Sequence, residues 1–142
     1  MISANECFEK GLLKKEAPSL DLARKSLNQA GFFLNEAHDL INLEKKEMSV
    51  IALYNAFFHV SRALLFKDGI KERSHYCVAR YIESEYTSKK KLDSIFLNSF
   101  EVLMGLRKNI QYSTEKTMID EDLNGFYNVC ERFISVVEGM IK

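Results

Sequence analysis

The apolar positions of the chain are densest between residues 50 and 66. Within this run the polar residues Asn55, His59 and Arg62 recur at intervals of four and three positions. On an α-helix this spacing places the three side chains in a single line. The segment therefore predicts a helix that is buried on nearly all sides and presents one narrow polar line to a cleft or a partner.

Elsewhere along the chain the apolar residues recur every three or four positions, which is the pattern of amphipathic helices. Ser3 and Glu6 have capping-box spacing and predict a short first helix that ends near Lys14. Pro18 suits the start of the next helix, and Gly69 suits the left-handed end of the central one. No alternation typical of strands is present. The predicted helices cover about residues 3–14, 18–43, 47–67, 74–86, 88–112 and 119–141.

These helices predict a single all-α domain over residues 1–142, folded as an up-and-down antiparallel bundle of about five to six helices. The short links between long helices favour antiparallel neighbours. A single proline and six glycines also favour helices over a β fold rich in loops. The ten phenylalanines and six tyrosines are more than a thin bundle buries easily. We therefore expect a homodimer.

The charges of the chain are balanced, with 20 basic and 20 acidic residues. This balance excludes binding of polyanions through overall charge, but it allows a local basic patch. The lysine run at residues 89–91 is most simply a solvated face, and contact with a nucleic-acid backbone is the alternative. The apolar run at residues 50–66 is interrupted and slightly short for a membrane span, and the N-terminus has no signal-peptide pattern. We therefore expect a cytoplasmic protein without a membrane partner.

The three cysteines, Cys7, Cys77 and Cys130, are far apart and have no CxxC spacing. Neither a disulfide framework nor a zinc site follows from such an arrangement. Helical spacing puts Cys77 and Cys130 on or near apolar faces. We therefore expect small buried thiols that are kept reduced in the cytoplasm.

The sequence lacks the common motifs of catalysis and cofactor binding. It has no Gly-rich phosphate loop, no HExxH, no paired Glu-x-x-His and no Gly-x-Ser-x-Gly. The histidines His38, His59 and His75 fall on different predicted helices or their edges, and their spacing does not demand a metal. We expect neither a metal nor a cofactor.

Two pairs of residues could bind a phosphate. His59 and Arg62 lie three residues apart on one helix face, close enough to act on one group. The alternative is a buried polar pair that fixes the register of neighbouring helices. His75 follows Ser74 at a predicted helix start, where free backbone N–H groups attract anions. An ordinary surface helix start explains that second feature equally well.

Arg107 is the most unusual charged residue of the chain. It continues the apolar stripe formed by Phe96, Phe100 and Leu103, which lie at helical spacing before it. A buried guanidinium without a partner is costly. Arg107 must therefore reach a carboxylate, a helix end, a partner chain or a ligand phosphate.

Three segments resemble the HEPN superfamily, a group of small helical domains found in higher eukaryotes and prokaryotes. ALYNAFFHVSRALLFKDGI at residues 52–70 is similar to the family's central helix, with its Tyr-x-Ala-x-x-His-x-x-Arg-Ala-Leu-Leu run. SHYCVARYI at 74–82 resembles the Ser-His helix start that follows it, and LRKNIQY at 106–112 resembles the segment with an arginine before a short polar motif. The opening segments FEKGLLKK and ARKSLNQAGFFLNEA also look like those of small prokaryotic members. The likeness covers nearly the whole chain.

The resemblance implies a dimeric helical bundle, often encoded beside a minimal nucleotidyltransferase as a toxin–antitoxin pair. Many members are metal-independent ribonucleases with an arginine followed four to six residues later by histidine. Here those positions hold Gln111, Tyr112 and Ser113, and no histidine follows His75. The chain is closer to a branch in which Asp-Tyr follows the arginine, with glutamine in place of the aspartate.

We therefore expect a non-catalytic or weakly catalytic HEPN protein that binds RNA, a nucleotide or a nucleotidyltransferase partner. One alternative is a ribonuclease with a rearranged site, in which Arg107 serves the phosphate and His59 or His75 moves the proton. Another is a purely structural subunit that binds a second protein. The expected ligand-binding residues are Asn55, His59, Arg62, His75, Arg107, Gln111 and Tyr112.

Overall fold

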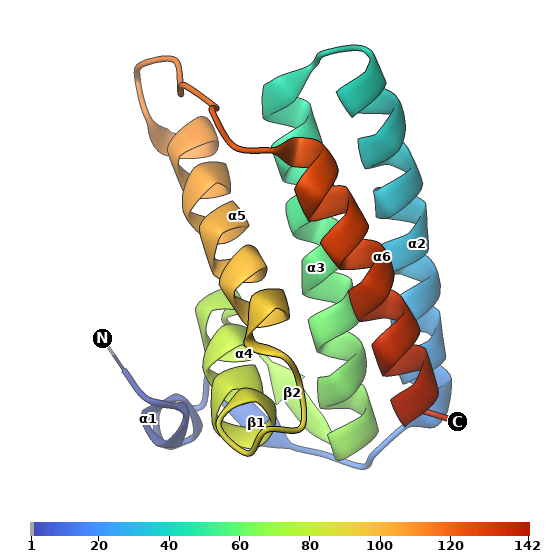
Figure 1. Ribbon diagram of the computed structural model, residues 1–142. Coiled ribbons are helices and arrows are strands. Elements are labelled where there is room, and N and C mark those ends of the chain that lie inside the picture. The colour runs from blue at the N-terminus through green and yellow to red at the C-terminus, as the bar shows by residue number, and fades with distance from the viewer. Residues whose placement is uncertain (1) are drawn as a thin grey trace.

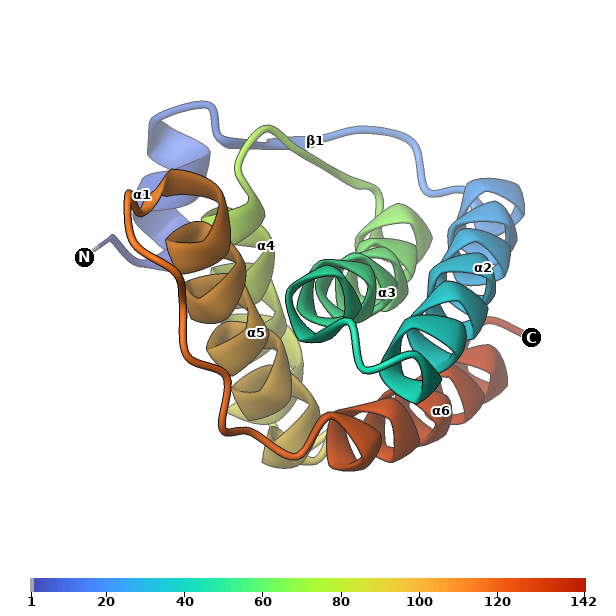
Figure 2. The ribbon, with the colours of Figure 1, turned by 90° about the horizontal axis from the view of Figure 1, so that it is seen from above.

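Helix α3 (Lys46–Asp68) runs through the centre of a helical bundle in the computed structural model, which describes residues 2–142. Figure 2 shows α3 between α2 (Leu20–Asn42) and α6 (Leu123–Met140) on one side and α4 (His75–Ile82) and α5 (Ser94–Tyr112) on the other. The chain runs up in α2, down in α3, up in α5 and down in α6 (Figure 1). The predicted all-α, up-and-down architecture is confirmed.

The side chains of α3 are buried on nearly all sides, as the sequence predicts. Tyr54 and Phe57 are fully buried. Phe57 packs against Phe133 of α6 with the ring centroids 5.9 Å apart, and Phe133 stacks on Phe96 of α5 at 4.8 Å. One aromatic cluster therefore joins three of the long helices around the axis of the bundle.

Helix α3 is the one helix in residues 2–142 that is long and apolar enough to cross a membrane by length and composition. In its most apolar window, 72% of the residues are buried inside the bundle. Packing within the protein therefore explains the apolar composition of this helix.

The N-terminal segment differs from the prediction. Helix α1 (Ala4–Glu9) has the expected capping box at Ser3, but it ends well before Lys14. The chain turns at Gly11, whose φ of +72° suits glycine, and enters strand β1 (Leu13–Lys15). This strand pairs antiparallel with β2 (Ile70–Glu72), which follows α3. The sequence shows no strand pattern here, because each strand has only three residues and the partner of β1 is far away along the chain.

The start of α5 is also later than predicted. Residues 83–87 form a short π-helix, η1 (Glu83–Thr87), directly after α4. Lys90 then adopts a left-handed φ of +58°, which interrupts any helix through the lysine run. Asp93 caps α5 by accepting a hydrogen bond from the backbone N–H of Ile95 at 2.9 Å. The lysines at 89–91 are therefore on an exposed turn outside the helix.

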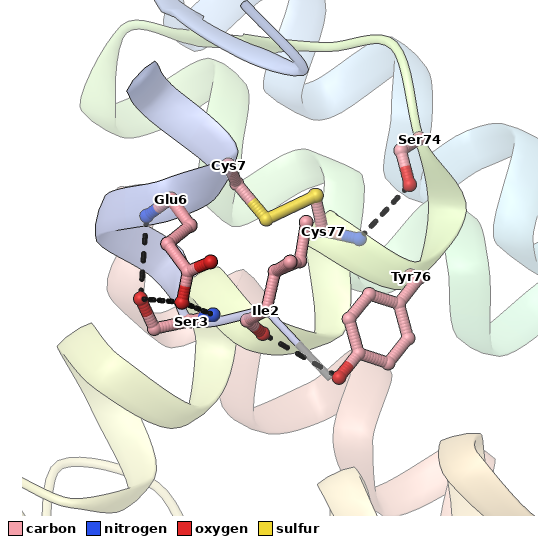
Figure 3. The surroundings of a disulfide bond; sticks show 7 residues. All are labelled: Ile2, Ser3, Glu6, Cys7, Ser74, Tyr76 and Cys77. Carbon is pink, nitrogen blue, oxygen red and sulfur yellow. Dashed lines mark hydrogen bonds between the residues drawn. A yellow bond between two sulfur atoms is a disulfide. The ribbon is translucent and has the colours of Figure 1, made fainter. Parts of the chain in front are cut away.

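A disulfide between Cys7 and Cys77 joins α1 to the first turn of α4 (Figure 3). The expectation of a free thiol at Cys77 was therefore wrong. Sequence spacing gave no sign of the pairing because the fold alone brings the two Cα atoms to 5.9 Å. Disulfides are uncommon in reducing compartments, so this bond does not fit the cytoplasmic environment we expected. The expectation for Cys130 is confirmed, since it is a buried free thiol whose pKa is raised by burial.

Candidate functional site

The polar line of α3 lies on half-buried positions of an otherwise buried helix. The His59 ring stacks on Phe33 of α2, with the ring planes 3° from parallel and the centroids 5.5 Å apart. Its Nδ1 is buried and has no hydrogen-bond partner among residues 2–142. Burial, and to a lesser extent the charges of Arg62 and His75, lower the pKa of His59 to about 4. His59 is therefore a neutral side chain at neutral pH and supplies no charge for a phosphate.

Arg62 is already paired within the fold. Its Nε lies 2.8 Å from Oε1 of Glu72 on β2, although the N–H does not point along a good hydrogen bond. Its guanidinium also lies over the ring of Phe66, 4.8 Å from the centroid. Arg62 thus joins α3 to β2, and most of its charge is offset by the carboxylate of Glu72.

His75 and Arg107 come together on a surface hollow between α4 and α5. We call it the His75–Arg107 hollow. Its volume is about 440 Å³, and it is lined by His75, Tyr76, Met104, Arg107 and Lys108. The two residues that the sequence singled out on separate helices therefore share one site. The first turn of α4 supplies His75, and the last two turns of α5 supply Arg107.

Tyr54 of α3 contacts both His75 and Arg107. Its hydroxyl forms a 2.5 Å hydrogen bond with Nδ1 of His75. The Arg107 guanidinium carbon lies over the Tyr54 ring, 4.4 Å from its centroid. Phe58, one turn further along α3, stacks on the His75 ring with centroids 4.0 Å apart. The buried face of α3 thus fixes the orientation of both polar side chains.

The hollow carries positive charge without a carboxylate to offset it. Arg107 and Lys108 line it, and neither forms a salt bridge with any residue in the range 2–142. The Nε of Arg107 is buried and has no hydrogen-bond acceptor in that part of the chain. Burial, followed by the charge of Arg107, lowers the pKa of His75, while Glu72 opposes the shift. A neutral imidazole and two cations make a site suited to an anion.

The other predicted residues lie outside this hollow. Gln111 and Tyr112 are exposed on the last turn of α5, one turn beyond Arg107 and Lys108, and Tyr112 is 72% exposed. Asn55 is half-buried on α3 and does not line the hollow. The structure therefore unites only His75 and Arg107 of the seven expected ligand-binding residues.

Tyr54 and Lys108 are contributors that the sequence reasoning did not single out as ligand-binding residues. Tyr54 lies inside the apolar run of α3, where an aromatic residue is the ordinary content of a core. The one available signal was its hydroxyl, since a buried tyrosine O–H usually needs a hydrogen-bond partner. Lys108 follows Arg107 directly, and a second basic residue beside the charge on the apolar stripe was a signal that could have been used.

A metal site is not formed by the described part of the chain. Residues 2–142 contain no cluster of three or more histidine, cysteine, aspartate or glutamate side chains that could hold a metal ion. The ring of His38 lies beside that of Tyr127 on α6, with 5.3 Å between the ring centroids.

Acidification is expected to destabilise the fold partly through His59. Its pKa of about 4 in the folded protein is below the ordinary value of 6.5, so the unfolded chain binds the proton more readily between these values. The stabilisation from neutral His59 is complete above pH 6.5 and is lost as the pH falls to 4. Denaturant unfolding across this range, compared with His59→Phe, should show a weaker pH dependence in the variant. The lowered pKa of His75 changes the stability with pH in the same direction, and His75 is present in both proteins. Identical pH profiles would contradict this role of His59.

The fold and the site together define a small all-α protein with a surface hollow between α4 and α5 that is lined by Arg107, Lys108 and His75. The family model described as "HEPN domain" matches residues 23–140, which is most of the chain. The chain belongs to the HEPN family. The match begins within α2, so α1 and Cys7 lie before it, whereas the other half of the disulfide, Cys77, lies inside it. A search of curated proteins found no match.

Proposed function

We propose that this HEPN protein is a non-catalytic or weakly catalytic module that binds RNA or a nucleotide through a phosphate in the His75–Arg107 hollow. The observation that carries the proposal is Arg107, a half-buried guanidinium fixed over an aromatic ring without an acidic partner among residues 2–142. Keeping such a charge unpaired is costly, and a phosphate would satisfy it. Lys108 would add a second cation to the same group.

We propose weak or no catalysis because few side chains near Arg107 can transfer a proton. The residues after Arg107 offer Gln111 and Tyr112 where a nuclease of this family would carry histidine. Glutamine cannot transfer a proton, and tyrosine is a poor base at neutral pH. His59 is held on Phe33, and it does not line the hollow. His75 is the one imidazole beside Arg107 in the described part of the chain.

The position of His75 favours a second candidate, a ribonuclease with a rearranged active site. In that reaction Arg107 would stabilise the charge on phosphorus, and His75 would take the proton of the ribose 2′-OH. The shared place of His75 and Arg107 in the lining of one hollow supports it more than any arrangement with His59, which does not line the hollow. The hydrogen bond between Nδ1 of His75 and Tyr54 argues for binding over cleavage.

We also propose that the protein forms a homodimer and that a minimal nucleotidyltransferase is its protein partner. Exposed apolar side chains support an interface with a second copy of the chain or with another protein. They lie on several helices and on the turn after α2, and include Phe32, Leu43, Met48, Val102 and Val136. A monomer at high micromolar concentration in light scattering would contradict the dimer.

Labelled single-stranded RNA, incubated with the protein in metal-free buffer, tests the proposed function. We expect salt-sensitive binding in which the RNA remains intact. Cleavage that persists in a chelator and is lost in both Arg107→Ala and His75→Ala would establish the ribonuclease instead. Neither binding nor cleavage would overturn both candidates and leave a structural subunit that binds another protein.

A further inference from the structure

We propose that Tyr54 is a positioning residue that holds His75 in the tautomer with its proton on Nε2, so that His75 donates a hydrogen bond to a phosphate oxygen. The inference rests on the proposed function, and it assigns His75 the role of a donor and not of a base. It follows from one buried hydroxyl and from the partners that surround it.

The hydroxyl of Tyr54 is the donor in its bond with His75. Tyr54 is fully buried, and burial raises its pKa to about 12 although the charge of Arg107 opposes the shift. The hydroxyl therefore keeps its proton at neutral pH, and that proton needs an acceptor. Within residues 2–142 the one hydrogen-bond partner of this hydroxyl is Nδ1 of His75. Nδ1 therefore accepts.

The protonation of His75 then follows. Burial and the charges of Arg107 and Arg62 disfavour the imidazolium, while the carboxylate of Glu72 opposes them only in part. A neutral imidazole carries one proton, and when Nδ1 accepts a hydrogen bond the proton is on Nε2. The stack on Phe58 holds the ring plane, so Nε2–H is the polar group that His75 offers to the hollow.

Tyr54 also holds the guanidinium of Arg107 in place. The ring beneath Arg107 and the hydroxyl bonded to His75 belong to one side chain, so their relative positions are set by a single rigid group. A phosphate in the hollow would meet the guanidinium of Arg107 and the Nε2–H of His75 together. To act as the base for a ribose hydroxyl, His75 would need an unprotonated Nε2 facing the hollow. The hydrogen bond from Tyr54 to Nδ1 keeps the proton on Nε2 and so prevents this role.

The experiment compares the His75 imidazole nitrogens by ¹⁵N NMR in the wild type, Tyr54→Phe and Tyr81→Phe. Tyr54→Phe keeps the buried ring and removes only the hydroxyl. Tyr81→Phe is the matched control, because Tyr81 is also a buried tyrosine, but it does not line the hollow and its hydroxyl donates to Asp68 at 2.8 Å. We expect the Nε2–H tautomer in the wild type and in the control. In Tyr54→Phe we expect a mixture of tautomers and a raised His75 pKa, since the lost O–H stabilised the neutral ring.

Binding of inorganic phosphate supplies the second readout. We expect Tyr54→Phe to weaken it by about two- to tenfold, the effect of one hydrogen bond, and Tyr81→Phe to leave it unchanged. An Nδ1–H tautomer in the wild type, or an unchanged tautomer in Tyr54→Phe, would overturn the inference. If the tautomer behaves as expected and the wild type binds neither phosphate nor RNA, the proposed function fails while the role of Tyr54 stands.

Discussion

Replacement of Arg107 by alanine is expected to weaken RNA binding by about 10- to 100-fold, the effect of losing hydrogen bonds between a cation and a phosphate. The guanidinium has no salt bridge to a carboxylate among residues 2–142, so no carboxylate in that range competes with a ligand for it. The binding constant from fluorescence anisotropy, measured at one fixed salt concentration, is the quantity to compare. Arg107→Lys should recover only part of the affinity, because lysine lacks the planar fork of donors.

Arg132 provides the matched control for this experiment. It is also an arginine over an aromatic ring, 5.8 Å from the centroid of Phe96, but it is exposed on α6 and outside the hollow. Arg132→Ala should bind RNA as the wild type does. Equal losses in both variants would indicate a general charge effect, and full binding by Arg107→Ala would place the ligand elsewhere.

Removal of the Cys7–Cys77 disulfide is expected to lower the free energy of unfolding by about 2–4 kcal/mol. The bond closes a loop with a sequence separation of 70 residues, and it holds the six-residue helix α1 against α4. The double variant Cys7→Ser/Cys77→Ser, unfolded in denaturant beside the wild type, gives the difference directly. The largest local change should be around α1, which is otherwise joined to α4 by few contacts such as the edge-to-face pair of Phe8 and Tyr81.

A thiol reductant separates this effect from a simple packing defect. It should destabilise the wild type and leave the double serine variant unchanged, since the remaining Cys130 is already a free buried thiol. A wild type that is indifferent to the reductant, together with two titratable thiols at positions 7 and 77, would show that the cysteines are not joined.

The helical architecture could be predicted from the sequence because its signals are local. The dense apolar run of α3 and the three- and four-residue spacings elsewhere mark buried helix faces, and each helix keeps its pattern regardless of its neighbours. The strand pair β1–β2 and the disulfide could not be predicted in this way. Each joins the N-terminal segment to residues after α3, and only the folded bundle brings them together.

The candidate site was predictable in part for the same reason. Arg107 stood out because a charge interrupts an apolar stripe, and His75 because it follows a capping serine. That they share one hollow depends on how α4 and α5 pack on α3, which no spacing reveals. Arg62 shows the reverse case. Its place on the polar line of α3 suggested a ligand, whereas the fold pairs it with Glu72 on β2.

An NMR titration of ¹⁵N-labelled protein with a short single-stranded RNA tests most directly whether the phosphate binds in the His75–Arg107 hollow. We predict that the largest shift changes occur at the Arg107 guanidinium, the His75 imidazole and the backbone amides of residues 104–108. Shift changes that are confined to the exposed lysines at residues 89–91, or to the opposite side of the bundle between α2 and α6, would contradict the account.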